Sequence, residues 1–138
     1  MKSLNTLIKL AQRRLDELRR RLADLEVQRD KLLALIKRLD DELASELEQA
    51  YQRPEMSTFF GDFSRRIRKR KEEITREIAA LATQMEKVRE DIMEGFSELK
   101  KYEVARDHAK ARERQEQERK ETKLLDEIAQ QQFIRKTE

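Results

Sequence analysis

The chain has 138 residues, of which 44% are charged and 5% are aromatic, with a formal net charge of +3 and no cysteine. It contains two glycines and one proline, where an average domain of this length has about 16 such residues, so it has few places to turn. This composition excludes disulfides and thiolate metal sites, and apolar residues in narrow stripes can bury a seam but no thick core around a substrate.

The chain also lacks an apolar stretch that could enter a membrane. No apolar run exceeds five residues, whereas a spanning helix needs about 20. The first residues are interrupted by Lys9, Arg13 and Arg14 and have no apolar block of a signal peptide. We therefore expect a soluble protein that stays in the cytoplasm.

Residues 3–52 are predicted to form one helix, because Leu, Arg, Lys, Glu and Ala dominate this stretch and nothing in it breaks a helix. Apolar residues recur in it every seven positions in two interleaved series, which is typical of a coiled-coil seam. The series are Ile8, Leu15, Leu22, Ile36 and Leu43, and Leu4, Ala11, Leu18, Leu25, Leu32 and Leu39.

Arg29 interrupts the first series at an otherwise apolar position. A buried basic residue there would select one register or strand number at a cost in stability. The alternative, which we favour, is that the guanidinium extends to the edge of the seam.

Residues 53–57 are the predicted turn. Pro54 removes a backbone donor and pushes Arg53 out of the helical region, and Ser57 can cap the next helix. If the chain folds back here, residues whose numbers add up to about 110 should face each other.

The second half of the chain passes this test. Its heptad series are Phe60, Ile67, Ile74, Leu81 and Val88, and Ile78, Met85, Ile92 and Leu99. The predicted partners are Leu18 and Ile92, Leu25 and Met85, Ile36 and Ile74, and Ala11 and Leu99. The two stripes have matched lengths, so the sequence predicts an all-α fold, a long antiparallel two-helix coiled-coil hairpin over residues 1–106, in a chain that is monomeric when free.

Residues 107–138 are predicted to form a charged helical extension of the hairpin. In residues 103–123 thirteen of twenty-one residues are charged, with both signs mixed, which suits a solvated helix. Apolar residues then return in a short amphipathic segment, as Leu124, Leu125, Ile128, Phe133 and Ile134. This segment can stay exposed, dock on the start of the first helix, or bind another protein as a helical anchor.

The sequence carries no pattern of a catalytic, cofactor or metal site. His108 is the only histidine and lies in a polar stretch, without a second histidine to share a metal. There is no glycine-rich phosphate loop, and the acidic residues alternate with basic ones as on solvated helix faces. We expect no enzyme activity, no cofactor, no metal and no small-molecule substrate.

One run of residues is strongly basic: Arg65, Arg66, Arg68, Lys69, Arg70 and Lys71. A basic run before heptads resembles the layout of a leucine-zipper DNA-binding protein, but these heptads have a partner within the chain and no base-reading Asn stands in the run. Nucleic acid, an acidic protein or a membrane surface could bind here, and a plain solvated face is the interpretation we favour. The role of the run stays unassigned, and we do not expect nucleic acid as a partner.

The two ends of the chain resemble those of a known family. Residues 4–11 (LNTLIKLA) and 123–130 (KLLDEIAQ), closed by Arg135 and Lys136, are similar to the two ends of the flagellar export protein FliJ. Length, two-helix layout, basic charge and the lack of cysteine are similar as well. The resemblance covers the whole chain in architecture and is residue-specific at the ends.

This resemblance implies a non-enzymatic part of the flagellar type III export apparatus, at the inner face of the bacterial cytoplasmic membrane. Proteins of the family form a coiled coil similar to the central shaft subunit of rotary ATP synthases, enter the export ATPase ring, contact the membrane export gate and escort export chaperones. The resemblance implies ATPase contact at the two ends, through Leu4, Leu7, Ile8, Leu10, Leu125, Asp126, Glu127, Ile128, Phe133 and Arg135.

Two alternatives from other classes remain at this point. One is a nucleic-acid-associated coiled coil that uses the basic run. The other is a structural dimer whose seam pairs between chains. Salt-dependent DNA binding distinguishes the first, and the hydrodynamic mass distinguishes the second.

Overall fold

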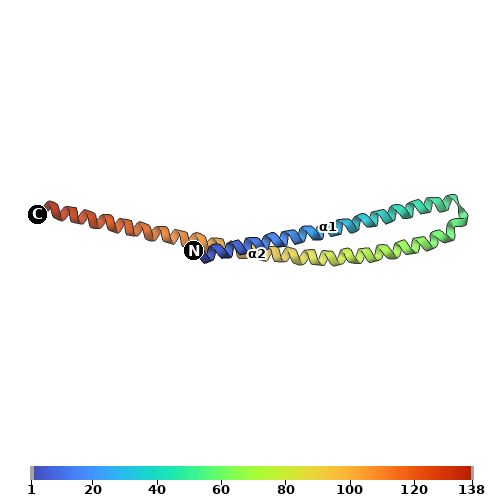
Figure 1. Cartoon of the computed structure of the whole chain (residues 1–138), viewed down its shortest axis with the longest axis horizontal. Coiled ribbons are helices and arrows are strands. Elements are labelled where there is room, and N and C mark those ends of the chain that lie inside the picture. Colours follow the sequence, from blue (N-terminus) through green and yellow to red (C-terminus); the bar gives the residue numbers. More distant parts are fainter. Residues whose placement is uncertain (1, 138) are drawn as a thin grey trace. The chain divides into compact units, whose positions relative to one another are not determined.

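The computed structural model describes residues 2–137, which form two α-helices joined by one short 3-10 helix (Figure 1). Helix α1 spans Lys2–Gln52, η1 spans Pro54–Met56, and α2 spans Ser57–Thr137. These described residues contain no strand. The fold is therefore the all-α helical hairpin that the heptad pattern predicts, interrupted only where the single proline stands.

The turn follows from the chemistry of Pro54. Arg53, the residue before it, is extended (φ −128°, ψ 90°), and Pro54 is the first residue of η1. The N–H of Arg53 donates to the carbonyl of Gln49 (3.0 Å), and the N–H of Met56 donates to the carbonyl of Arg53 (2.9 Å). Main-chain groups at the helix end are thus paired although the helix stops.

Ser57 does not cap the second helix in the way that the sequence predicts. Its backbone is helical (φ −60°, ψ −38°), and its N–H donates to the carbonyl of Pro54. An N-cap residue would instead have an extended backbone and use its side-chain oxygen. The 3-10 turn leads directly into α2, so the main chain of Ser57 makes the connection.

Two compact units divide the described chain. We call residues Leu15–Glu94 the hairpin unit, and Met1–Arg14 together with Gly95–Glu138 the terminal unit. These units are divided after Arg14 and after Glu94. The predicted division into a hairpin of residues 1–106 and an extension of residues 107–138 is a different one and stays a prediction.

The core of the hairpin unit is a seam between antiparallel helices. Leu25, Leu81, Met85 and Val88 form a buried cluster, and the partly buried Leu18, Leu22, Leu32 and Ile92 pack against it. Ile74 is fully buried, and Ile67 is 7% exposed. Two of the four predicted pairs, Leu18 with Ile92 and Leu25 with Met85, therefore lie in one cluster, as the register requires.

Arg29 lies at the edge of this seam. Its side chain is 36% exposed, and its Nη2 atom lies 3.1 Å from Oδ1 of Asp30, the next residue in α1. Asp30 is 66% exposed, so the guanidinium that pairs with it lies at the surface and not inside the seam. This placement agrees with the interpretation that Arg29 extends outward.

The terminal unit has a short seam and a long unpaired helix. Ile8 is 5% exposed, Gly95 is buried, and Leu4, Ala11 and Leu99 are half-buried. Helix α2 continues beyond this seam to Thr137, and every described residue from 111 onward is exposed. Of the three possibilities for the C-terminal apolar segment, docking on the start of α1 is thus not what the structure adopts.

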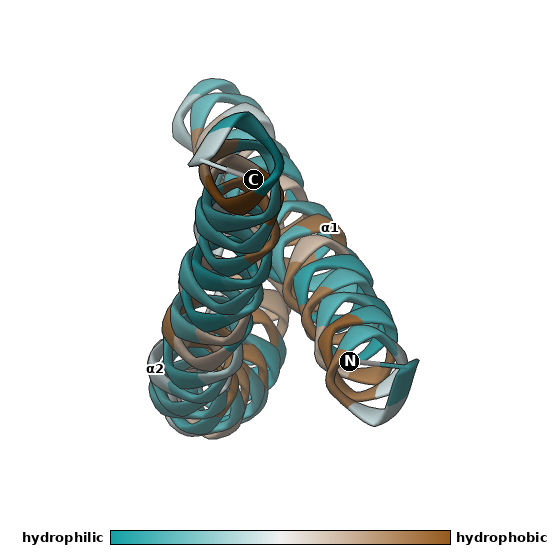
Figure 2. Cartoon of the chain, turned by 90° about the vertical axis from the view of Figure 1, so that its left-hand side faces the viewer, coloured by the Kyte–Doolittle hydropathy of each residue, from teal (hydrophilic) through white to brown (hydrophobic). Residues whose placement is uncertain are grey.

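Hydrophilic residues make up most of both helices, with hydrophobic residues between them, as the colours of Figure 2 show. Among residues 2–137 no polar or charged side chain is buried. Within the same residues, neither helix has a stretch apolar enough to cross a membrane.

Candidate functional site

The N-terminal candidate residues divide into buried and exposed ones. Ile8 belongs to the seam and cannot contact a partner without leaving it. Leu7 and Leu10 point outward and are 39% and 54% exposed. Leu4 is half-buried and lines a shallow groove of the terminal unit, together with Ala105, His108, Ala111, Arg112 and Gln115 of α2.

The C-terminal candidate residues are all exposed. Leu125 is 65% exposed, Ile128 43% and Phe133 68%, and Asp126, Glu127 and Arg135 lie among them in water. Leu124 and Ile134, at 57% and 56%, extend the apolar surface. In Figure 2 the last turns of α2 show this as hydrophobic colour within a hydrophilic helix.

These apolar side chains do not share one narrow face of α2. Successive residues of a helix are about 100° apart, so Leu124, Ile128 and Leu125 fall within about 100° of one another around α2. Phe133 is turned about 180° from Leu124, and Ile134 lies about 80° from Leu124 on the other side. A partner that contacts them all must therefore wrap around α2 or form a ring about it.

The two groups of candidate residues do not form a single patch. Leu4 lies against α2 near residues 105–115, and α2 then continues as a helix to Thr137. At about 1.5 Å per residue, Leu125 lies about 21 Å further along α2 than Ala111. The terminal unit therefore offers two separate apolar surfaces. One lies beside the start of α1, and the other lies on residues 111–137, which we call the free part of α2.

The basic run of residues 65–71 is only partly neutralised. Arg65 pairs with Asp62, one turn earlier in α2. The Nη1 atom of Arg70 lies 3.3 Å from Oε2 of Glu73, and Nζ of Lys71 lies 2.5 Å from Oδ1 of Asp40 in α1. The other three residues of the run, Arg66, Arg68 and Lys69, are exposed and make no ion pair with a described residue.

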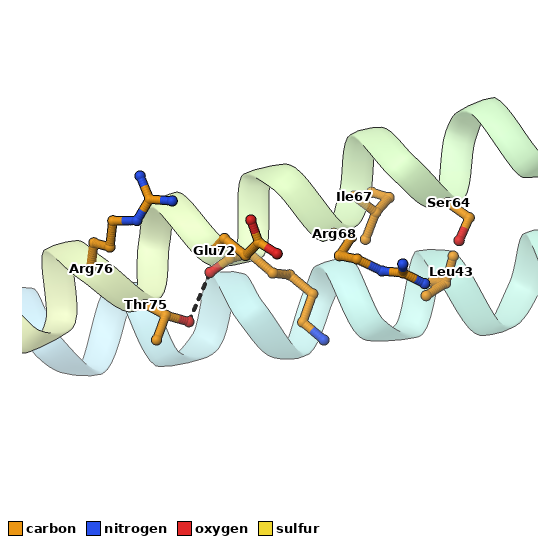
Figure 3. A pocket seen from close by; sticks show the side chains of 8 residues that line it. Leu43, Ser64, Ile67, Arg68, Glu72, Thr75 and Arg76 are labelled. Carbon is orange, nitrogen blue, oxygen red and sulfur yellow. Dashed lines mark hydrogen bonds between the residues drawn. The ribbon is translucent and has the colours of Figure 1, made fainter.

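A groove between the two helices of the hairpin unit runs beside this basic run (Figure 3). Leu43 of α1 and Ser64, Ile67 and Arg68 of α2 line one end of it, and Glu72, Thr75 and Arg76 line the other. The hydroxyl of Thr75 donates to the carbonyl of Lys71 (2.8 Å), so it is turned toward its own helix. The groove carries both charge signs and no nucleophile with a base beside it, so it has no catalytic arrangement.

The sequence analysis did not single out a group of aromatic and apolar side chains at the loop end of the hairpin unit, by which we mean residues 46–71. Tyr51 is 88% exposed, Met56 40% and Phe59 51%, and the rings of Phe59 and Phe63 stack with centroids 6.5 Å apart. The available signal was that four of the seven aromatic residues of the chain lie between positions 51 and 63. Of these four aromatic residues, Phe60 belongs to a heptad series, and the other three lie outside the seam.

The described residues contain no cluster of three or more His, Cys, Asp or Glu side chains that could hold a metal.

Two side chains of α2, Tyr102 and Lys87, have shifted pKa values. The hydrogen bond that Tyr102 donates to Glu98 (2.6 Å) raises the pKa of the phenol above its ordinary value. The hydrogen bond from Lys87 to Asp91 raises the pKa of the Lys87 ammonium. Each of these hydrogen bonds joins two residues four positions apart in α2, so both shifts have a local cause within one helix.

The described residues form a helical hairpin with exposed apolar side chains in both of its units, and this helical layout was compared with known families. The family model described as Flagellar FliJ protein matches residues 1–138, the whole chain. Searches of curated proteins and of solved structures found no match. The family is one of structural export components with helical coiled-coil character, and is not known as a family of enzymes. This chain therefore belongs to the flagellar FliJ protein family and is a component of the flagellar export machinery.

Proposed function

We propose that this protein is a non-enzymatic coiled-coil stalk that binds the flagellar export ATPase ring through its terminal unit and stimulates ATP hydrolysis by that ring. In the same role it links the ring to the membrane export gate and to export chaperones, at the inner face of the cytoplasmic membrane. The observation that carries the proposal is the free part of α2, where every described residue is exposed, including the apolar Leu124, Leu125, Ile128, Phe133 and Ile134.

Exposed apolar side chains on an otherwise solvated helix indicate a binding surface. Monomeric proteins rarely leave such side chains grouped in water, and an amphipathic helix commonly binds by placing them in a groove of a partner. The positions around α2 suit a partner that surrounds the helix, because Leu124 and Phe133 project in opposite directions. A ring of ATPase subunits is such a partner.

The charged surface of the terminal unit suits contacts that form and break during turnover. Exposed ion pairs contribute only about 0 to 1 kcal/mol each, so no single polar contact would hold the ring in one state. Binding to the assembled ring alone would stabilise it by about 2.7 kcal/mol at a hundredfold excess over the dissociation constant. Stimulation of hydrolysis should therefore be largest where the ATPase is dilute and its ring is incomplete.

The test is steady-state phosphate release by the cognate ATPase against increasing amounts of this protein. We expect stimulation by the wild-type chain and its loss in the triple variant L125S/I128S/F133S. A second variant, L7S/L10S, tests the start of α1 while it leaves the buried Ile8 in the seam. Wild-type protein without the ATPase should release no phosphate.

A matched control removes three exposed apolar side chains elsewhere. Val27, Leu33 and Met93 belong to the hairpin unit and are 52%, 47% and 72% exposed. The variant V27S/L33S/M93S should stimulate like the wild type. Equal loss in the control and in the terminal variant, or no stimulation by the wild type at any ATPase concentration, would contradict the proposal that the terminal unit acts on the ring.

A further inference from the structure

The loop end of the hairpin unit, residues 46–71, holds the excess positive charge of the chain. Seven of the 32 basic residues and four of the 29 acidic residues lie in this stretch, so it accounts for the formal net charge of +3. The rest of the chain has 25 residues of each sign. Attraction of an anionic partner over longer distances is therefore concentrated at the loop end.

Exposed apolar side chains stand at the same end, and they come from three different elements. Tyr51 belongs to the last turn of α1, Met56 to η1 and Phe59 to the first turn of α2. A protein groove that receives a helix needs its anchors on one face, three or four residues apart. A lipid headgroup layer accepts apolar side chains in any arrangement, so the geometry favours a bilayer over a groove.

The basic residues next to this end spread around α2. Arg66, Arg68 and Lys69 have no ion-pair partner among the described residues. Around α2, Arg66 and Lys69 are about 60° apart, and Arg68 is about 100° from Lys69 and about 160° from Arg66. The three side chains therefore spread over about 160° of α2, on the side away from the seam residue Ile67. A nucleic-acid groove or an acidic helix that contacts the face of Arg66 and Lys69 would leave Arg68 out, whereas an anionic surface approached by the loop end attracts all three.

The spacing along α2 suits a membrane interface. At about 1.5 Å per residue, residues 65–71 lie about 9 to 18 Å from Phe59. Side chains of interfacial helices enter the headgroup layer by about 5 to 10 Å, and the Debye length in cells is about 8 Å. With Phe59 in that layer, the unpaired basic side chains lie close enough to the lipid phosphates to be attracted.

We propose that the loop end of the hairpin unit docks end-on on an anionic phospholipid bilayer. Tyr51, Met56 and Phe59 enter the headgroup layer, and Arg66, Arg68 and Lys69 contact lipid phosphates. This surface lies in the hairpin unit, and the proposed ATPase contact lies in the terminal unit. Either proposal can therefore fail without the other.

The first test is co-sedimentation of the full chain with vesicles of phosphatidylcholine, with and without phosphatidylglycerol. We expect binding only to vesicles that contain phosphatidylglycerol. A basic residue near an anionic surface contributes about fivefold to membrane affinity, so R66Q/R68Q/K69Q should bind about 100-fold more weakly. The matched control, R114Q/R119Q/K120Q, loses the same charge from exposed positions of the terminal unit and should bind like the wild type.

The second test locates the contact. The chain has no cysteine, so a polarity-sensitive dye can be attached at one introduced cysteine, Ser57→Cys at the loop end or Thr122→Cys on the free part of α2. Anionic vesicles should shift the emission to shorter wavelength only for the dye at position 57. Phe59→Ser should reduce this shift, while Phe133→Ser should leave it unchanged.

Three outcomes would overturn the proposal. The first is equal weakening by the two charge variants, which have the same net charge, because it would indicate unspecific attraction. The second is equal binding to neutral vesicles. The third is binding to duplex DNA, but not to vesicles, that R66Q/R68Q/K69Q alone abolishes, which would assign the basic run to nucleic acid.

Discussion

Lys71 of α2 pairs with Asp40 of α1 across the hairpin unit, with 2.5 Å between Nζ and Oδ1. Both side chains are partly exposed, at 35% and 49%, so the pair contributes at most about 1 kcal/mol. The pair matters because its position reports the register of the two helices. The two residue numbers add up to nearly the same total as those of Leu25 and Met85 in the core, so one register holds at the surface and inside.

The ion pair provides a test of the hairpin that leaves the core intact. In the variant D40C/K71C, a short bismaleimide should crosslink the two cysteines within one chain, because their side chains replace groups in contact. The control D40C/K87C places the second cysteine about 24 Å further along α2 and should not crosslink internally. Crosslinked dimers as the sole product at low protein concentration would show instead that the seam pairs between chains.

The seam should be most sensitive where burial is complete. Ile74 is fully buried, so Ile74→Ala should lower the free energy of unfolding by about 2 to 5 kcal/mol, the range for a large apolar side chain truncated in a core. Leu33, which is 47% exposed, should lose only about 0.5 kcal/mol on the same change. Urea unfolding followed by circular dichroism measures both. Similar losses at the two positions would contradict this seam.

Arg29 should be replaceable with a gain in stability. It stands at a heptad position, and its guanidinium contributes an exposed pair with Asp30. In Arg29→Leu an apolar side chain joins the seam, so the free energy of unfolding should rise by roughly 1 kcal/mol. Arg29→Gln, which removes the charge without adding an apolar group, should show no gain. A loss of stability in Arg29→Leu would mean that the arginine supports the register.

The free part of α2 should not contribute to the stability of the hairpin. Leu125, Ile128 and Phe133 are exposed, and exposed substitutions usually change the free energy of unfolding by at most about 0.5 kcal/mol. L125S/I128S/F133S should thus melt like the wild type. Ile8→Ser, at a position that is 5% exposed, should lower the melting temperature. A strong drop in the triple variant would mean that this segment docks on another part of the chain.

Tyr102 should titrate above the ordinary tyrosine pKa of 10.0, because its hydroxyl donates to Glu98. The raised pKa belongs to the folded state, so the stability it contributes is present below pH 10 and is lost as the pH rises through the folded pKa. Absorbance titration in a Tyr51→Phe background reports Tyr102 alone. Glu98→Ala should bring the pKa back toward 10, and no change in that variant would exclude the hydrogen bond as its cause.

Most of the hairpin could be predicted because it depends on local chemistry and on the spacing of apolar residues along the chain. The period of the apolar residues assigns Ile67, Ile74, Leu81 and Val88 to one face of a helix whatever the rest of the chain does. The single proline can end only one helix, and stripes of equal length on its two sides leave one register that buries both. These features follow from short-range geometry, which the sequence contains in full.

The candidate site was predictable only in part. The sequence itself determined which residues are apolar and at which helical position, so the return of Leu125 and Ile128 after a polar stretch was visible in it. The heptad series also separates Ile8, which belongs to the seam, from Leu7 and Leu10, which do not. Only the tertiary structure decided that Lys71 is paired while Arg66 is not, and that Phe59 remains in water at the loop end. Exposure and pairing depend on which groups the second helix brings near, and a period along one helix contains no information about that neighbour.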